Sequence, residues 1–546
     1  MKKNLKIVSL LLFSILLNYS SSAYTHADTL RGSNGTGRNW WNLTHYDLSV
    51  SFDFINKSIE GTNTISLDIT KKPTDSMQLD LQEPMIIDKV LYDGTNINFV
   101  KEGNVWWLMH PFKNRDSGSH LKITVYFHGT PRAAVNPPWD GGFSWTKDEK
   151  GTNWIAVSCQ GLGASIWWPC KDVQWDEPDS GMSLEFQIPD STLSVVSNGR
   201  CKINGKKNEQ KNKYVWHWEV KNPINNYDAT FYIGDYAHWH DTMNGENGKL
   251  DLDFWVLSYN IDKAKKQFND VKSMIKCFEY WLGPYPFYED GYKLVEAPYL
   301  GMEHQSAIAY GNKYQMGYLG KDRTNTGIGM QFDYIIVHES GHEWFGNSVT
   351  AKDIADNWIQ EGITTYSESL ITECELGKEK GQKYCRGEWD NIFNSKPIIG
   401  TYGVNKEGAP DMYDKGAAIM YMIRCIVNDD DEFRMILRGL SKTFYHQTTT
   451  TAHVEKYITR AAKIDLAPFF NQYLRTRNIP ELEYYIKDGL LNYKFNNVVP
   501  EFSLPISITS GKIQTIISPT PVWQHIKWKG GYNVKFSDDF LIKIKE

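Results

Sequence analysis

The spacing of hydrophobic residues divides the chain into three stretches. From Asn39 to about Trp255, apolar and polar residues alternate in short runs such as Tyr46 to Phe52. From about Asp262 onward apolar residues recur mostly at intervals of three and four, and beyond Pro480 short alternating runs return. Alternation of period two predicts strands with one buried face, and intervals of three and four predict amphipathic helices. We therefore predict a multidomain α+β protein in which an all-β region and a small β region flank a mostly helical one.

A chain of 546 residues is too long for a single hydrophobic core. The run Arg477-Asn478-Ile479-Pro480 is typical of a boundary between domains. The divisions we predict are a signal peptide over residues 1–27, an N-terminal β domain over 28–255, a helical domain over 256–477 and a C-terminal β domain over 478–546.

The first residues have the pattern of a secretory signal peptide. Three lysines among the first six residues precede the apolar run Ile7 to Leu17. A signal peptidase could cleave after Ala23 or after Ala27. The apolar run is short for a membrane span, and no later segment reaches that length. We expect export to the periplasm or the extracellular space and a mature chain without a membrane span. An uncleaved membrane anchor is the alternative.

Composition and charge narrow the class of partners. Hydrophobic residues make up 41% and aromatic residues 14% of the chain, as in folded proteins. The formal net charge of −6 is small for this length, and there is no basic cluster with interleaved aromatic residues, so we expect no nucleic-acid partner.

The seven cysteines are an odd number, so at least one has no partner within the chain. Because no Cys-x-x-Cys pair occurs, neither a zinc ribbon nor a redox motif is indicated. Cys159 with Cys170, or Cys374 with Cys385, can bridge in an oxidising compartment, and the sequence alone does not decide the pairing.

The candidate chemistry lies in the helical region, in the run His338-Glu339-Ser340-Gly341-His342. Two histidines four residues apart on a helix lie one turn from each other on one face, so both rings can reach one ion. Eighteen residues separate His342 from Glu361, which offers a carboxylate. Catalytic zinc takes three protein ligands, so we predict one Zn²⁺ per chain held by His338, His342 and Glu361. Glu339 is not needed as a ligand and is free to act as a general base toward water.

A helix around the two histidines is predicted because Ile335, His338, His342 and Phe345 fall on one face. The dipeptide Gly346-Asn347 is a plausible stop for this helix. Gly341 in its interior costs on the order of 1 kcal/mol relative to Ala, so something other than helix propensity must hold it.

A second helix, from about Ile354 to Cys374, places Glu368 two turns from Glu361 on the same face. Zinc-bound histidines commonly donate their other ring N–H to a carboxylate, which makes Glu368 a candidate partner for one of the ligands. The alternative is a solvated glutamate on the outer face of the helix.

These residues resemble the zinc signature of the gluzincin aminopeptidases of the aminopeptidase N and leukotriene-hydrolase type. His338-Glu339-x-x-His342, eighteen residues and then Glu361 within Trp358-x-x-Glu361-Gly362 match that signature, and Trp344-Phe345-Gly346-Asn347 continues the match. Leu300-Gly301-Met302-Glu303-His304 corresponds to the family's exopeptidase motif Gly-x-Met-Glu-Asn. The resemblance covers nearly the whole chain after the signal peptide. It implies an N-terminal all-β domain, a thermolysin-like catalytic domain over 256–477 and a small C-terminal β-sandwich.

The resemblance also implies how a substrate would be held. Glu303, beside Gly301 and Met302 of the same motif, would bind the free α-amino group of a peptide. A blocked N-terminus would leave that buried carboxylate unpaired, so discrimination would be sharp. Tyr413, in the context Tyr-x-Lys-Gly-Ala, would donate a hydrogen bond to the oxyanion, and Gln160 would help to line the pocket for the first substrate residue.

The sequence departs from the family pattern in four ways. Leu300 replaces a glycine, which bears on how closely the backbone approaches a substrate. His304 replaces an asparagine and would add a titrating group near the amine site. Tyr413 follows Glu361 by fewer residues than is usual in the family. We expect the chain to lack the large C-terminal helical domain common in the family, and therefore to have a more open active site.

We therefore predict an exported zinc-dependent aminopeptidase that acts on peptides with a free N-terminus. One alternative is a zinc endopeptidase or another zinc hydrolase on the same scaffold; Glu303 argues against it, whereas His304 and the missing helical domain keep it open. Another alternative is a catalytically silent binding protein. Such proteins usually lose a metal ligand or the base, and here none is lost.

Overall fold

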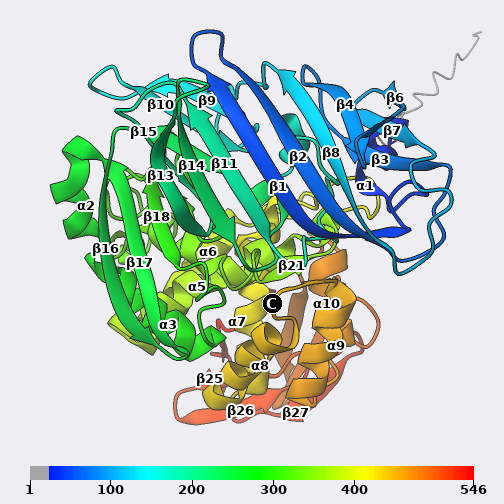
Figure 1. Cartoon of the computed structure of the whole chain (residues 1–546). Helices are drawn as coiled ribbons and strands as arrows, with labels where there is room; N and C mark the ends of the chain where they lie inside the picture. The colour runs from blue at the N-terminus through cyan, green and yellow to red at the C-terminus, as the bar shows by residue number, and fades with distance from the viewer. Residues whose placement is uncertain (1–23) are drawn as a thin grey trace, which may run out of the picture.

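The computed structural model describes residues 24–546, which form three regions stacked along the molecule (Figure 1). The blue and cyan strands of the N-terminal region lie at the top, the helices in the middle and the small orange and red β region at the bottom. The prediction of a multidomain α+β protein is confirmed. Residues 1–23, which make up most of the predicted signal peptide, lie outside the described residues, and the described chain begins with the short helix α1 (His26–Gly32).

The N-terminal region is built on an eight-stranded sheet that follows the predicted alternation. On its strand β1 (Trp41–Asp53), Tyr46, Leu48 and Val50 are fully buried, and a turn over residues 54–57 leads into the antiparallel β2 (Ser58–Ile69). The sheet order is β13-β14-β11-β1-β2-β8-β4-β5, and the other strands are β13 (Arg200–Asn208), β14 (Lys213–Val220), β11 (Met182–Ile188), β8 (His120–Gly129), β4 (Ile86–Tyr92) and β5 (Thr95–Ile97).

Two smaller sheets complete the N-terminal region. One has the order β12-β15-β10-β9, with β12 (Ser194–Ser197), β15 (Phe231–Gly234), β10 (Asn153–Ser158) and β9 (Gly142–Lys147). The other has the order β3-β7-β6, with β3 (Ser76–Asp80), β7 (Val105–Met109) and β6 (Phe99–Glu102). Their apolar faces share one hydrophobic core with the large sheet.

The middle region combines a five-stranded sheet with helices. The sheet order is β16-β17-β18-β20-β19, with β16 (Tyr236–Gly245), β17 (Gly248–Leu257), β18 (Tyr292–Glu296), β20 (Ile308–Tyr310) and β19 (Gly301–Met302). Because β17 pairs in parallel with β18, this sheet extends back across the predicted division at residue 255. Apolar and polar residues alternate in β16 and β17 as they do in the N-terminal strands. The sequence pattern therefore does not show that these two strands belong to a different sheet.

The helices of the middle region pack against this sheet and against one another. They are α2 (Ile261–Gln267), α3 (Val271–Leu282), α4 (Tyr334–Gly341), α5 (Trp358–Leu376), α6 (Lys378–Glu388), α7 (Asp414–Val427), α8 (Asp430–Thr443), α9 (Thr451–Ala462) and α10 (Ala467–Arg475). A short parallel pair, β21 (Val349–Ala351) with β22 (Gln447–Thr449), joins the segment after α4 to the segment before α9. Within residues 24–546, no helix is long and apolar enough to cross a membrane.

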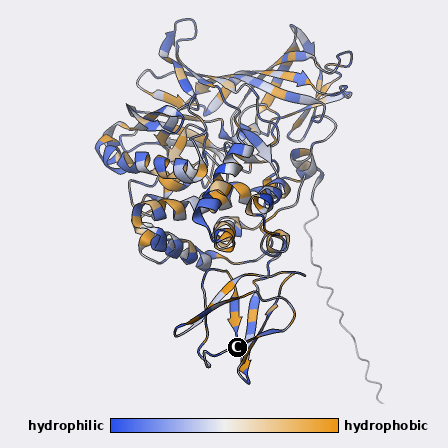
Figure 2. Ribbon diagram, turned by 90° about the horizontal axis from the view of Figure 1, so that it is seen from below, coloured by the Kyte–Doolittle hydropathy of each residue, from blue (hydrophilic) through white to orange (hydrophobic). Residues whose placement is uncertain are grey.

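The C-terminal region is a small sandwich of two sheets, set apart from the helices in Figure 2. One sheet has the order β27-β24-β23-β29, with β27 (Gln524–Lys527), β24 (Leu490–Asn496), β23 (Glu481–Lys487) and β29 (Lys543–Lys545). The other has the order β26-β25-β28, with β26 (Ile513–Ile517), β25 (Ile506–Ser510) and β28 (Lys535–Phe536). The described residues after Arg477 include no helix.

The single disulfide in the described part of the chain joins Cys277 on α3 to Cys374 on α5, across 97 residues. The pairings considered from the sequence are therefore wrong, since Cys159, Cys170 and Cys385 are free and buried. Helices α3 and α5 pack side by side, which brings the α-carbons of the bonded cysteines to 6.2 Å. The disulfide therefore links α5, the helix that carries Glu361, to the neighbouring helix α3.

Replacing both bonded cysteines by serine should lower the free energy of unfolding by about 2–4 kcal/mol, because a long loop is no longer closed in the unfolded chain. Denaturant unfolding of the oxidised protein measures this change. Alkylation of the denatured wild-type protein should label two more thiols after reduction than before. Equal labelling before and after reduction would contradict the disulfide.

Candidate metal centre and active site

The two candidate histidines lie at the C-terminal end of α4. Asp333 caps the start of the helix, and its carboxylate accepts hydrogen bonds from two backbone N–H groups of the first turn. The helix ends at Gly341, earlier than the predicted stop at Gly346, and His342 follows as the C-cap with helical backbone angles. His338 and His342 therefore keep the one-turn spacing, and their Nε2 atoms lie 3.3 Å apart.

Glu361, near the start of α5, brings a carboxylate to both rings. Its Oε2 atom lies 3.3 Å from Nε2 of His342 and 3.8 Å from Nε2 of His338. All three side chains are buried, and one donor atom from each lies within 4.8 Å of the others. Two imidazole nitrogens and one carboxylate oxygen are the donors that catalytic zinc takes, so the residues present fit one Zn²⁺.

Hydrogen bonds hold both rings with Nε2 toward the centre. Nδ1 of His338 lies 2.8 Å from Oε1 of Glu368, whose other oxygen accepts a hydrogen bond of 2.6 Å from the Tyr384 hydroxyl. Nδ1 of His342 lies 3.0 Å from the backbone oxygen of Phe345. Because a carbonyl oxygen only accepts, Nδ1 of His342 carries the proton and Nε2 keeps its lone pair for a metal.

Two more buried carboxylates, Glu303 and Glu339, lie against the three donors. One carboxylate oxygen from each of them and a ring nitrogen of His342 are within 4.8 Å of one another. Burial raises the pKa of Glu339 to about 7, and the neighbouring Glu303 and Glu361 add to the rise. Burial also raises the pKa of Glu303. Carboxylates gathered away from water repel one another, so the charge of the site favours a bound cation.

The N-terminal region completes the site through Gln160 and Tyr227. Nε2 of Gln160 donates to Oε1 of Glu303 over 2.6 Å and to Oε1 of Glu361 over 3.1 Å. The Tyr227 hydroxyl donates to the same oxygen of Glu303 over 3.1 Å. These bonds join the carboxylates of the helical region to the β region. No motif in the sequence pointed to Tyr227.

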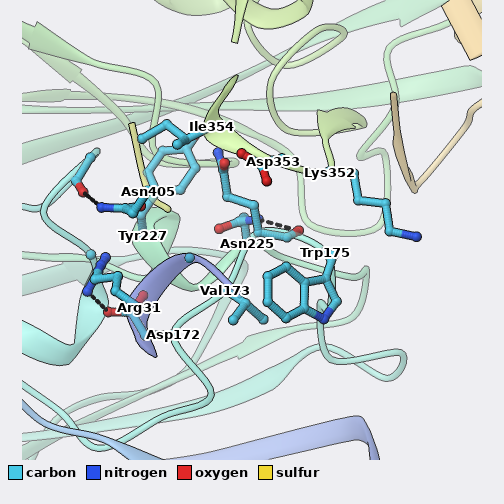
Figure 3. Close-up of a pocket in the computed structure, with 14 residues that line it drawn as sticks. Arg31, Asp172, Val173, Trp175, Asn225, Tyr227, Lys352, Asp353, Ile354 and Asn405 are labelled. Carbon is cyan, nitrogen blue, oxygen red and sulfur yellow. Dashed lines mark hydrogen bonds and ion pairs between the residues drawn. The ribbon is translucent and has the colours of Figure 1, made fainter. Parts of the chain in front are cut away.

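Tyr227 also lines a small cavity of about 40 Å³ (Figure 3). In this cavity Arg31 of α1 pairs with Asp172 at 2.8 Å. The amide of Asn405 donates to the backbone oxygen of Gly161 over 3.3 Å. The loop that carries Asn405 thus holds the turn next to Gln160, and the first described helix is tied to Asp172.

The exopeptidase-like motif forms an edge of the five-stranded sheet. Strand β19 pairs with β20 and has no second neighbour among the described strands. A Cβ placed on Gly301 would lie 2.5 Å from Oε1 of Glu339, so the backbone of this edge passes directly over Glu339. Met302, which follows Gly301 in the sequence, is buried and packs in the core of the N-terminal region.

The two substituted motif positions behave differently. Leu300 lies at the wall of the cavity that the candidate metal ligands also line, whereas His304 does not line it. His304 is fully buried, its Nδ1 lies 2.7 Å from the Tyr232 hydroxyl, and burial lowers its pKa to about 3. The expectation of a titrating group near the amine site is wrong, because His304 turns toward the β region and stays neutral.

Tyr413 directly precedes α7 and lies beside the candidate metal ligand His338. The centre of its ring lies 6.0 Å from that of His338. Burial raises the pKa of Tyr413 far above its usual value, so the hydroxyl remains protonated and able to donate. Helix α7 crosses α5 at two glycines: a Cβ on Gly362 would lie 2.7 Å from Cα of Gly416. This close crossing sets Tyr413 near Glu361.

These residues surround one cavity of about 620 Å³, a size typical of ligand sites. All the site residues predicted from the sequence line this cavity except Glu368, which lies behind His338. Arg323, Tyr334 and Glu407 also line it, and no sequence signal had marked them.

Comparison with known proteins adds two family matches. A model described as the peptidase family M1 domain matches residues 266–473, and one described as the peptidase M1 N-terminal domain matches residues 42–227. The leukotriene A-4 hydrolase of Xenopus laevis is 22% identical over 77% of this chain and 68% of its own length. The aminopeptidase N of Lactobacillus helveticus is 22% identical over 82% of this chain and 52% of its own length. The chain thus spans about half to two thirds of these relatives.

Solved structures share the fold. The crystal structure of a mutant M1 zinc metallopeptidase from Deinococcus radiodurans, bound to a Tyr-Ser-Ala substrate, aligns with a TM-score of 0.66 at 18% identity. That alignment covers 81% of this chain and 96% of the other. Native yeast LTA4 hydrolase aligns with a TM-score of 0.64 at 19% identity and covers 80% of this chain and 68% of its own.

Gly416→Ala should destabilise the protein, although alanine favours a helix. The added Cβ would lie 2.5 Å from Cα of Gly362, and such overpacking costs about 1–3 kcal/mol against a gain of up to about 1 kcal/mol in helix propensity. Denaturant unfolding measures the difference. Gly35→Ala is the matched control, because its Cβ would meet nothing closer than 3.7 Å. A Gly416→Ala protein as stable as the wild type would show that the crossing is not close.

Proposed function

This chain belongs to peptidase family M1, and from that premise we propose that it is a zinc-dependent aminopeptidase that removes the N-terminal residue of peptides. The observation that carries the proposal is the place of Glu303, whose carboxylate lies within 4.8 Å of Glu339 and of the candidate ligand His342. An ammonium group paired with Glu303 leaves room for only the first peptide carbonyl to reach the metal centre, since one extended residue spans about 3.3–3.6 Å.

The side chains divide the chemistry among them. Bound zinc would supply Lewis-acid chemistry, polarising the carbonyl of the first peptide bond and lowering the pKa of water. The Glu339 carboxylate takes the proton of the attacking water. The Tyr413 hydroxyl donates a hydrogen bond to the oxygen that gains negative charge. Glu339 then passes its proton to the nitrogen of the leaving peptide as the carbon–nitrogen bond breaks.

Recognition of the free N-terminus follows from burial and charge. Gln160 and Tyr227 hold the Glu303 carboxylate in one position, so its geometry is set before the substrate arrives. An N-acetylated substrate would bring no positive charge to it and would leave a buried carboxylate unpaired. The same arrangement argues against an endopeptidase, which must pass a continuing chain through the place that these three side chains occupy.

We also propose that the protein is exported to the periplasm or the extracellular space, a proposal that rests on the lysines and the apolar run within residues 1–17. Expression of the full-length chain in a secreting host, followed by N-terminal sequencing of the recovered protein, tests it. Export predicts recovery outside the cytoplasm with the apolar run removed. Recovery from the cytoplasm with residue 1 intact would contradict it.

Glu339→Gln should strongly lower turnover while zinc remains bound, because Glu339 moves the proton and is not a ligand. We expect a loss of about 10²- to 10⁴-fold in kcat, measured as amino acid released from an unblocked peptide. Metal content per chain, measured by emission spectroscopy, should stay at the wild-type value.

Glu368→Gln is the matched comparison, because Glu368 supports His338 and does not line the cavity. It should weaken zinc affinity by about 10- to 100-fold and leave turnover of the zinc-saturated enzyme largely intact. Near-native turnover by the Glu339→Gln protein would refute the assigned chemistry.

A further inference from the structure

Arg323 is the one lysine or arginine among the described residues that line the catalytic cavity. Its side chain is 28% exposed, so it is anchored in the wall and still reaches the cavity. Most other charged residues in the lining are acidic. Apart from a bound zinc ion, a substrate carboxylate entering this cavity would therefore find one permanently cationic side chain.

Tyr334 holds the Arg323 guanidinium through two contacts. The guanidinium carbon atom lies 5.1 Å from the centre of the Tyr334 ring, and Nη1 donates to the Tyr334 hydroxyl. The Tyr334 ring in turn stacks on His338 with the ring centres 5.4 Å apart. Arg323 is thus separated from a candidate zinc ligand by one aromatic ring.

The acidic partner of Arg323 binds it only loosely. Nη2 lies 3.3 and 3.4 Å from the two carboxylate oxygens of Asp414, whereas strong charge-assisted bonds measure about 2.7–2.9 Å. A guanidinium has five N–H donors, so these contacts leave others for a ligand. The neighbouring Asp411 does not compete, because its two oxygens accept the backbone N–H groups of Phe393 and Asn394.

A peptide bound along β19 would extend into the cavity that Arg323 lines. With the amine at Glu303, a peptide added to the free edge of β19 runs antiparallel to that strand, past Gly301 toward Leu300. Gly301 lies against Ile335, since a Cβ on Gly301 would be 2.8 Å from the Ile335 side chain. Ile335 is the sequence neighbour of Tyr334, whose hydroxyl accepts the hydrogen bond from Arg323, and all three residues line the same cavity.

We propose that Arg323 binds the C-terminal carboxylate of a short peptide, so that the enzyme favours di- and tripeptides over longer or amidated ones. This inference rests on the proposed aminopeptidase function and deepens it. Glu303 and Arg323 would recognise the two charged ends of the same substrate, one on each side of the bond to be cleaved. A planar guanidinium suits a carboxylate because it can form two parallel hydrogen bonds.

The test compares Leu-Ala and Leu-Ala-Ala with their C-terminal amides, on the zinc-loaded enzyme. Each amide keeps the free amine and lacks the carboxylate. The wild-type kcat/KM should be at least about tenfold higher for the free acids. Equal values for acids and amides would overturn the inference without any variant.

Variants then locate the effect. Arg323→Gln should bring the ratio of acid to amide close to one mainly by lowering kcat/KM for the acids, and Arg323→Lys should keep part of the preference. Lys321→Gln is the matched control, because it removes the same charge from the same loop at an exposed side chain that does not line the cavity. An unchanged ratio in Arg323→Gln, or the same loss in Lys321→Gln, would refute the role of Arg323.

Binding measurements separate this inference from the proposed function. Titration of Leu-Ala and its amide into zinc-loaded Glu339→Gln protein gives the affinities without turnover. Tighter binding of Leu-Ala than of its amide supports the role of Arg323, even if the wild-type enzyme cleaves neither peptide. Failure to cleave either peptide would refute the proposed aminopeptidase function. Cleavage of both peptides with equal affinities would refute Arg323 alone.

Discussion

Close packing of three helices determines where the metal donors lie. Helix α4 presents the two histidines, α5 presents Glu361, and α7 follows Tyr413, so the centre exists only while these helices touch. Glycines permit the contacts: a Cβ on Gly341 would lie 2.7 Å from the Ser367 hydroxyl, and Gly362 faces Gly416 across the second crossing. The glycine that weakens α4 as an isolated helix is the residue that lets it approach α5.

This packing gathers acidic groups that would repel one another in a dry interior. Glu303, Glu339 and Glu361 are all buried, and a metal cation together with a substrate ammonium would compensate them. Gln160 bridges two of these carboxylates from the N-terminal region. The N-terminal β region is therefore part of the site, because it orients the group that would recognise the substrate amine.

The sequence predicted features that depend on local spacing. The regions follow from periodicities of two and of three to four, and the donor histidines from their separation by one helical turn. Features that depend on contacts between distant segments left no local pattern. Tyr227 lies in a short 3-10 helix and Arg323 in a loop, both outside any motif. The disulfide spans 97 residues, and the orientation of His304 is set by the β region.

The central claim is that Glu303 selects substrates by their free amine. The most direct measurement is the release of free amino acid from one peptide in two forms, unblocked and N-acetylated, by the zinc-loaded protein. The account predicts release from the unblocked peptide alone. Cleavage of both forms at an internal bond would contradict it and identify an endopeptidase.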